Sequence, residues 1–145
     1  MTTPVELLLA EDDPADVALV RHAFQKHNLS NPIHVVHDGA QALEFVFRTD
    51  RYADRPPGTP YVILLDLKLP LVDGVEVLRR IKGDPDTRSI PVVMLTSSGE
   101  DRDLDECYRL GVNSYIVKPV DFDRFDEVVR QLGLYWLLVN QPPPG

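Results

Sequence analysis

The chain has 145 residues, of which 43% are hydrophobic and 26% are charged. These proportions are ordinary for one soluble globular domain with a single sizeable core. The formal net charge of −8, with no cluster of lysines and arginines, argues against a partner held through nucleic-acid phosphates. The single cysteine, Cys107, excludes an internal disulfide and a cysteine-based metal site.

The amino terminus and the apolar segments give no sign of export or membrane insertion. The opening MTTPVELLLAEDD has no basic segment, and its apolar run is too short for a signal peptide. No segment approaches the apolar length that a membrane-spanning helix needs. We therefore expect a cytoplasmic protein with one domain over residues 1–145, a core over about 5–139, and a proline-rich tail over 140–145.

Short apolar runs alternate with segments of helical periodicity along the chain. The apolar runs predict strands at residues 5–10, 33–37, 61–65, 90–95 and 114–117. The intervening periodic segments predict helices at residues 14–26, 39–47, 75–82, 100–110 and 122–139. Strands joined by helical crossovers predict a parallel sheet with helices on both faces. We expect the doubly wound, flavodoxin-like α/β fold, with strand order 2-1-3-4-5 and an extended last helix.

The start of the first predicted helix and the connection over residues 48–60 have distinctive compositions. The first helix begins with Pro14 at its first position, Asp13 as its cap and Asp16 in its first turn. Residues 48–60, RTDRYADRPPGTP, are polar and longer than most connections in α/β proteins. We interpret them as an exposed loop with a helical extension at its start, and the sequence reveals no function for it.

Polar side chains follow the strands at their carboxyl ends. The buried run YVILL ends at Asp66, and the corresponding residues after the other strands are Glu11, Asp12, Thr96 and Lys118. The carboxyl ends of parallel strands meet at one edge of the sheet, where open α/β sheets bind ligands. We therefore expect these five residues to form one site.

The residue types at this edge indicate phosphoryl chemistry. Three adjacent carboxylates repel one another and call for a cation, and an all-oxygen ligand set favours Mg²⁺. The ammonium of Lys118 and the hydroxyl of Thr96 can receive a phosphoryl group. Asp66, at the middle of the edge, is then the candidate nucleophile that forms an acyl phosphate.

Each of these residues also has an ordinary structural explanation. Glu11 and Asp12 could be solvated charges at a helix start, and Thr96 could cap its own turn. Lys118 could be a surface lysine. These explanations together require four unrelated coincidences at the same edge, so we favour the shared site.

Four motifs make the chain resemble the receiver domain of bacterial two-component response regulators over residues 5–139. LLLAEDD is similar to that family's first strand and acid pocket, and ILLDLKLPLVDG to its phosphoacceptor strand and following loop. VVMLTSSG and NSYIVKPV are similar to its switch threonine and lysine-proline segments.

This resemblance implies roles for the acidic residues. Asp66 would accept a phosphoryl group from a phosphohistidine on a sensor histidine kinase. Glu11 and Asp12 would form the acid pocket, and Asp12, Asp66 and the backbone carbonyl of Lys68 would bind Mg²⁺.

The resemblance also implies a switch. Lys118 would bind a phosphoryl oxygen, and its bond to Pro119 is a candidate for the cis form. The hydroxyl of Thr96 would turn toward the phosphoryl group, and Tyr115 would swing inward behind it, past the small Ser97. Lys68 and Ser98 would set the lifetime of the phosphorylated state. The output surface would comprise the helix after strand 4, strand 5 and the last helix.

The last helix carries more apolar surface than one core stripe needs, because LYWLLV is apolar all round. A wide core stripe would explain it, but we favour a homodimer through this helix. The ending LYWLLVNQPP and the long loop before strand 3 also resemble regulators that pair with phytochrome kinases, which makes a bacteriophytochrome a candidate kinase. We expect no effector domain and no membrane partner, so the chain would signal by docking or phosphorelay.

Three other classes of protein fit less well. A haloacid dehalogenase-type phosphotransferase normally has a second Asp where this chain has Lys68, so we expect a phosphoacceptor switch that assists its own phosphorylation and dephosphorylation, not an enzyme with turnover. A nucleotide-binding module would need a glycine-rich loop in place of EDDPAD. A degenerate receiver would lack part of the pocket, and every position is filled.

Overall fold

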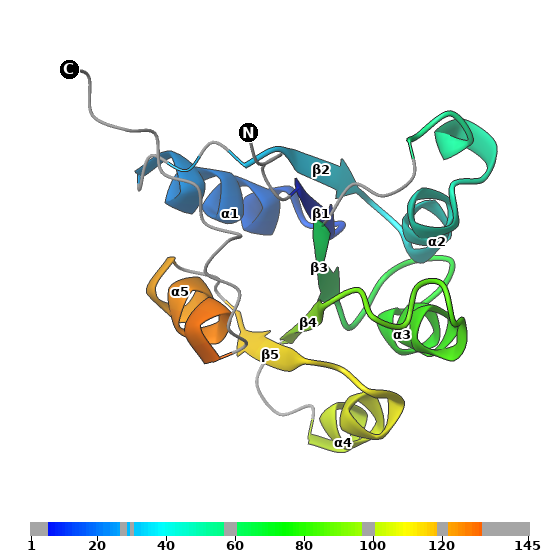
Figure 1. Cartoon of the computed structure of the whole chain (residues 1–145). Coiled ribbons are helices and arrows are strands. Elements are labelled where there is room, and N and C mark those ends of the chain that lie inside the picture. Colours follow the sequence, from blue (N-terminus) through cyan, green and yellow to red (C-terminus); the bar gives the residue numbers. More distant parts are fainter. Residues whose placement is uncertain are drawn as a thin grey trace.

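The computed structural model of the chain describes residues 6–26, 29, 31–56, 61–96, 101–118 and 122–131. A five-stranded parallel sheet forms its middle layer, with strand order β2-β1-β3-β4-β5 (Figure 1). The strands are β1 Glu6–Ala10, β2 Ile33–Val36, β3 Tyr61–Asp66, β4 Val92–Thr96 and β5 Ser114–Val117. This is the predicted doubly wound order.

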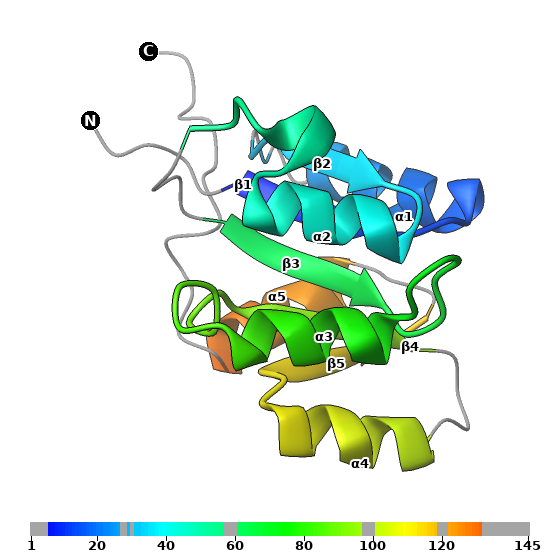
Figure 2. The same ribbon diagram turned by 90° about the vertical axis from the view of Figure 1, so that its right-hand side faces the viewer.

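Helices cover both faces of the sheet. The helices are α1 Pro14–Lys26, α2 Gly39–Phe47, α3 Gly74–Gly83, α4 Asp101–Leu110 and α5 Phe122–Gln131. α1 and α5 lie on one face, whereas α2, α3 and α4 lie on the other (Figures 1 and 2). None of the described helices has both the length and the hydropathy to cross a bilayer.

The core has two halves, separated by the sheet. All six residues of β3 are buried, and their side chains alternate between the halves. Val62 and Leu64 pack in the cluster that contains residues of α1 and α5, while Ile63 and Leu65 pack in the cluster with α2, α3 and α4. Full burial of one leucine contributes about 1.5–3 kcal/mol. A strand buried on both faces must be apolar throughout, which explains the continuous run in the sequence.

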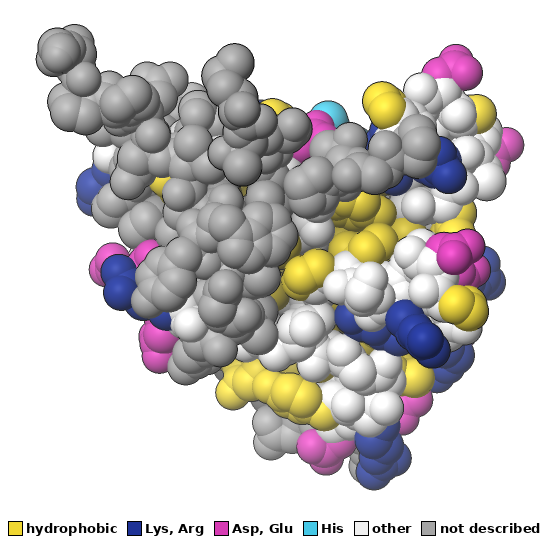
Figure 3. Space-filling view, viewed as in Figure 1, with side chains coloured by type: hydrophobic (Ala, Val, Ile, Leu, Met, Phe, Trp, Pro, Cys, Tyr) yellow, Lys and Arg dark blue, Asp and Glu magenta, His cyan; other side chains and the backbone are white. Residues whose placement is uncertain are grey.

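The surface seen along the sheet in Figure 3 carries charge of both signs. Acidic and basic side chains are interspersed over α2, α3 and α4, and hydrophobic side chains show between these helices and the sheet. Among the described residues on this face, the acidic side chains are therefore not gathered into one patch.

Four strand boundaries differ from the prediction. The third and fourth strands each end one residue later, at Asp66 and Thr96. The other two differences follow from hydrogen bonds. The fourth strand begins at Val92, not at residue 90, because the amide of Ile90 donates to the Thr87 carbonyl in a turn (3.0 Å) and Pro91 has no amide to donate. β2 ends at Val36, because the amide of His37 instead donates to the side chain of Gln41 at 3.1 Å.

The long loop after α2 contains the predicted helical extension, a 3₁₀ helix over Asp50–Tyr52. Arg55 anchors this loop to α2. Its guanidinium donates two hydrogen bonds to the Phe45 carbonyl, at 3.1 and 2.7 Å, and lies 4.2 Å from the centre of the Phe45 ring. The loop is thus fastened by a cation–π contact as well as by hydrogen bonds.

Several predicted features lie outside the described residues. These are the part of the last helix beyond residue 131, the proline-rich tail, Ser97, Ser98 and the Lys118–Pro119 bond.

The register of the strands brings their carboxyl ends into line. Ala10 pairs with Leu65, so that Glu11 follows beside Asp66. Asp66 pairs with Leu95, one residue before Thr96. Thr96 in turn pairs with Val117, one residue before Lys118. Glu11, Asp66, Thr96 and Lys118 are therefore each the last residue of a strand or the residue directly after it, at the same edge of the sheet.

Two glycines hold the loop after β3 close to its surroundings. A Cβ atom at Gly74 would lie 2.2 Å from the Asp66 carbonyl oxygen, and one at Gly39 would lie 1.7 Å from the Val72 carbonyl oxygen. The amides at these positions donate to Leu67 and Pro70 carbonyls, at 3.0 and 3.1 Å. Only glycine permits this close approach, which fixes the backbone around Asp66.

We expect Gly74→Ala to lower the free energy of unfolding by about 1–3 kcal/mol, because the added methyl group meets backbone that cannot move aside cheaply. Gly83→Ala, at the other end of the same helix, is the control. Nothing lies within 4 Å of the added Cβ there, so it should be neutral or stabilise by up to about 1 kcal/mol. Urea unfolding of both variants is the measurement, and equal losses would contradict the prediction.

Candidate functional site

Asp66 is the last residue of β3 and is only 6% exposed. The edge toward which the β3 arrowhead points in Figure 2 is the edge that carries it. One carboxylate oxygen, Oδ1, accepts a hydrogen bond from the Lys68 amide at 3.2 Å. The other, Oδ2, accepts one from Lys118 Nζ at 3.1 Å. The carboxylate is thus held in place by groups that donate to both of its oxygens.

Glu11 and Asp12 bring two further carboxylates to Asp66. Each of the three residues has an oxygen atom within 4.8 Å of the others'. Glu11 is fully buried, whereas Asp12 is exposed. Asp13 has a different role: its Oδ1 accepts a hydrogen bond from the Ala15 amide at 2.9 Å, at the start of α1. The structure therefore assembles the predicted acid pocket from Glu11, Asp12 and Asp66, with Asp13 as the helix cap.

The buried position of Glu11 opposes its negative charge. Burial, followed by the proximity of Asp66, raises the pKa of Glu11 to about 7, although Lys118 and the Asp13 amide act in the opposite direction. Glu11 Oε1 accepts from that amide at 3.1 Å. Oε2 lies 2.9 Å from Lys118 Nζ as an ion pair, without the geometry of a hydrogen bond. More positive charge at this point would therefore stabilise the ionised form of Glu11.

Lys118 is the cation of the site. Its Nζ lies 2.9 Å from Glu11 Oε2, 3.1 Å from Asp66 Oδ2 and 3.1 Å from Asp16 Oδ2. Burial by itself lowers the pKa of Lys118, but its contacts with the three acids outweigh burial and raise the pKa above its ordinary value. Lys118 is therefore charged throughout the physiological pH range.

Thr96 and Tyr115 lie on the two strands beside this charge cluster. Thr96 is buried at the end of β4, and its carbonyl accepts from the Lys118 amide at 2.8 Å. Tyr115 is 40% exposed, and its ring meets that of Tyr108 on α4 edge to face, with 6.3 Å between centroids. The side chain of Tyr115 is therefore turned outward, not toward Thr96.

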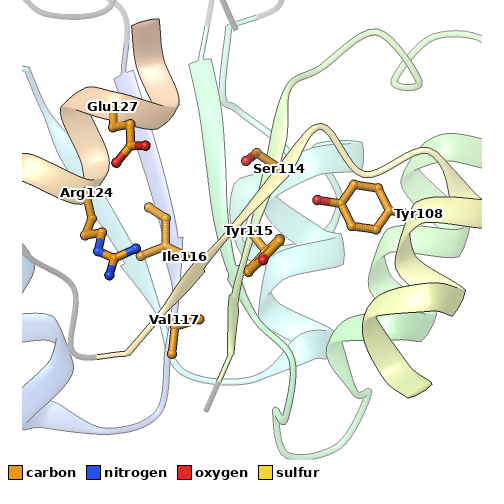
Figure 4. Close-up of a pocket in the computed structure, with 7 residues that line it drawn as sticks. All are labelled: Tyr108, Ser114, Tyr115, Ile116, Val117, Arg124 and Glu127. Atoms are coloured by element: carbon orange, nitrogen blue, oxygen red, sulfur yellow. The ribbon is translucent and has the colours of Figure 1, made fainter. Parts of the chain in front are cut away.

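Tyr115 also lines a pocket of about 260 Å³ on the surface formed by α4, β5 and α5 (Figure 4). Tyr108 reaches this pocket from α4, and Arg124 and Glu127 reach it from α5. The surface thus combines aromatic side chains with one charge of each sign.

Sequence reasoning assigned Asp16 only to the first turn of α1. In the structure its carboxylate contacts Lys118 and is just 16% exposed. The sequence position of Asp16 could have indicated that it lies near the site. Helix α1 starts at the carboxyl end of β1, so an acid in its first turn lies near the same edge of the sheet.

The donor set suits a hard divalent cation. The three clustered acids offer only oxygen atoms, and Asp12 is open to solvent, which leaves room for water ligands. The raised pKa of Glu11 is the property expected of a ligand whose cation balances its buried charge. The residues present therefore fit such an ion.

The parallel fold, the acid pocket and the lysine together define a class of protein. The chain belongs to the response regulator receiver domain family, whose sequence profile matches residues 7–130. The members of this family are phosphoacceptor switches.

Individual relatives are similar over nearly the whole chain. The solved bacteriophytochrome response regulator AtBRR is 48% identical, with a TM-score of 0.86 over 97% of this chain and 100% of that one. The probable methanogenesis regulatory protein FilR2 of Methanothrix harundinacea is 40% identical over 97% of this chain and 88% of its own length.

Divalent cations bind to relatives of this chain. Response regulator Rcp1 of Synechocystis sp. has been solved in a form with Mn²⁺ bound. That structure is 35% identical, with a TM-score of 0.76 over 97% of this chain and 100% of its own. Binding of a divalent cation is therefore shown for relatives of this chain that share its fold.

Proposed function

We propose that Asp66 accepts a phosphoryl group from a phosphohistidine of a sensor histidine kinase, in a reaction that depends on Mg²⁺. The observation that carries this proposal is the convergence on Asp66 of the two acids that follow β1 and the lysine that follows β5. A carboxylate oxygen of Asp66 forms the new O–P bond, and the P–N bond to the kinase histidine breaks. The imidazole leaves with the electron pair of that bond.

Glu11, Asp12, Asp66 and the backbone carbonyl of Lys68 would hold the Mg²⁺ ion. When bound, the ion supplies positive charge that offsets the repulsion between these acids and the incoming phosphoryl oxygens. The choice of Mg²⁺ among divalent ions rests on the all-oxygen donor set and on the exposure of Asp12 to water.

Lys118 and Thr96 would receive the transferred group. The Lys118 ammonium already lies 3.1 Å from Asp66 Oδ2, so a short movement takes it to a phosphoryl oxygen. The hydroxyl of Thr96 would donate to another. Charge-assisted hydrogen bonds of this kind are about twice as strong as neutral ones, and they exist only in the phosphorylated form. That difference biases the equilibrium between two conformations.

The change would be transmitted through Tyr115. Its outward position beside Tyr108 is the conformation we assign to the unphosphorylated state. Movement of Thr96 toward the phosphoryl group would let Tyr115 turn inward and remodel the pocket on the α4–β5–α5 surface. We propose this surface as the one that partners read, by docking or in a phosphorelay.

A kinase of the bacteriophytochrome type is the proposed phosphodonor. The support is the 48% identity to AtBRR, a bacteriophytochrome response regulator, over almost the entire chain.

We also propose a homodimer through the last helix. Phe125, one of its apolar residues, is buried against Phe24 of α1, with ring centroids 5.5 Å apart. This residue therefore serves the core, which leaves the apolar segment LYWLLV as the candidate for contact with a second copy.

Incubation with a small acyl phosphate and Mg²⁺ tests the phosphoacceptor. We expect the wild-type chain to gain the mass of one phosphoryl group, and neither Asp66→Asn nor the wild type in chelator to do so. Asp73→Asn is the matched control, because Asp73 lies in the loop that follows Asp66 and caps α3 by accepting from the Glu76 amide at 2.9 Å. An unmodified wild-type chain, or a modified Asp66→Asn variant, would refute the proposal.

Thr96→Ala should accept the phosphoryl group yet fail to move Tyr115, because the hydroxyl that responds to the phosphoryl group is missing. The measurement is ¹⁹F NMR of fluorotyrosine-labelled protein, with the Tyr115 signal assigned by Tyr115→Phe. Thr96→Ser keeps the hydroxyl and should retain the shift on phosphorylation. The same shift in Thr96→Ala would show that Thr96 does not couple the two.

The dimer is tested by sedimentation velocity on the full chain. Leu134→Glu combined with Leu138→Glu should convert the dimer to a monomer, since the charges would be buried in the contact. Asn140→Asp, just beyond the apolar segment, should leave the dimer intact. A monomeric wild type, both with and without phosphodonor, would disprove the dimer.

A further inference from the structure

Asp16 is a third acidic partner of Lys118, besides Glu11 and Asp66. Its Oδ2 lies 3.1 Å from Lys118 Nζ, the same distance as Asp66 Oδ2. Both side chains are largely withdrawn from solvent, with Asp16 16% and Lys118 17% exposed. Ion pairs withdrawn from solvent are screened less than pairs on the surface, so the attraction between Asp16 and Lys118 contributes to the electrostatics of the site.

A simple helix-start charge does not account for this geometry. An acid in the first turn of a helix is favoured by the helix dipole and needs no partner. The amino terminus of α1 already has Asp13, whose carboxylate caps the Ala15 amide and is exposed. Asp16 instead contacts a lysine that follows β5, a distant part of the chain.

Lys118 and a divalent cation would compete for the carboxylates of Glu11 and Asp66. Lys118 contacts Glu11 Oε2 and Asp66 Oδ2, and both residues belong to the three-acid cluster. Asp16 does not belong to that cluster. When Glu11 and Asp66 bind a cation, the Lys118 ammonium can keep its ion pair with Asp16.

We propose that Asp16 is a positioning residue that holds the Lys118 ammonium beside the site while Glu11 and Asp66 bind the divalent cation. The inference rests on the proposed metal-dependent function of Asp66 and deepens it. Asp16 favours cation binding because it gives Lys118 a partner that the cation does not use. It also keeps the ammonium within reach of a phosphoryl group on Asp66.

Calorimetric titration of the full chain with Mg²⁺ measures this effect. Asp16→Asn keeps the size of the side chain and removes its charge, so Lys118 should bind Glu11 and Asp66 more persistently. We expect Mg²⁺ affinity to fall about five- to tenfold, the usual scale of coupling between two binding events. Asp16→Glu should restore most of the affinity. Asp12→Asn, which removes a proposed ligand, serves as the reference for a large loss.

Two controls separate the contact from a general charge effect. Asp13→Asn removes one negative charge from the same helix start and retains a capping side chain, so its affinity should stay within about twofold of the wild type. In a Lys118→Met background, Asp16→Asn should cost no more affinity than Asp13→Asn does. Far-UV circular dichroism checks folding, and Asp16→Ser replaces Asp16→Asn if that variant does not fold.

Three results would overturn the inference. Equal losses in Asp16→Asn and Asp13→Asn would reduce Asp16 to an ordinary helix-start charge. An undiminished loss in the Lys118→Met background would show that Asp16 does not act through Lys118. A wild-type chain that binds no Mg²⁺ would overturn the metal-dependent function as well, whereas normal phosphorylation of Asp66 with either of the first two results would overturn the role of Asp16 alone.

Discussion

The ammonium group of Lys118 offsets part of the negative charge at the carboxyl edge of this sheet. Lys118 lies within 3.1 Å of oxygen atoms of Glu11, Asp16 and Asp66, and Asp12 stands beside them. Among the residues that the structure describes, one ammonium group pairs with three of these four acids, so the site favours the binding of a further cation. Burial, and then the nearby Asp66, raises the pKa of Glu11, so a further cation would stabilise its ionised form. A divalent ion would supply that positive charge and would also offset the negative charge of an incoming phosphoryl group, which is why metal binding and phosphorylation are linked in the proposed function.

The arrangement of the sheet makes such a cluster possible. Parallel strands in register deliver Glu11, Asp66, Thr96 and Lys118 to one edge, and the continuous apolar cores on both faces keep the strands in place. The burial of apolar side chains in the two cores thus compensates for the repulsion between the carboxylates. The glycine contacts of the loop after β3 serve the same end, because they leave the Asp66 backbone no freedom to retreat from its neighbours.

The same edge is connected to the outer surface of the molecule. The Lys118 amide donates to the Thr96 carbonyl, so the ends of β4 and β5 are joined at the site. Tyr115 lies further back on β5 and contacts Tyr108 of α4. Lys118 and Thr96 are therefore connected to the pocket between α4 and α5 through the β4–β5 strand pair and the contact between Tyr115 and Tyr108. This proximity is the physical basis of the switch we propose.

The sequence by itself determined the elements, their order and most of the site. Apolar runs of strand length, separated by helical periodicity, predict the doubly wound sheet, and that topology places Glu11, Asp12, Asp66, Thr96 and Lys118 at one edge before any coordinates are known. Local patterns could not settle where β4 begins, because a turn bond to Thr87 takes the Ile90 amide. Nor could they show how Arg55 fastens its loop, since that contact joins segments on either side of a turn.

The pairing of Asp16 with Lys118 was decided by tertiary structure alone. In the sequence, an acid in the first turn of a helix looks like any other charge that favours the helix dipole. Whether it also meets a lysine depends on how α1 packs over the sheet relative to the end of β5, and these segments are far apart along the chain. Periodicity records which face of a helix is buried, but the pairing of two polar groups at the ends of elements depends on how those elements are oriented in the folded chain.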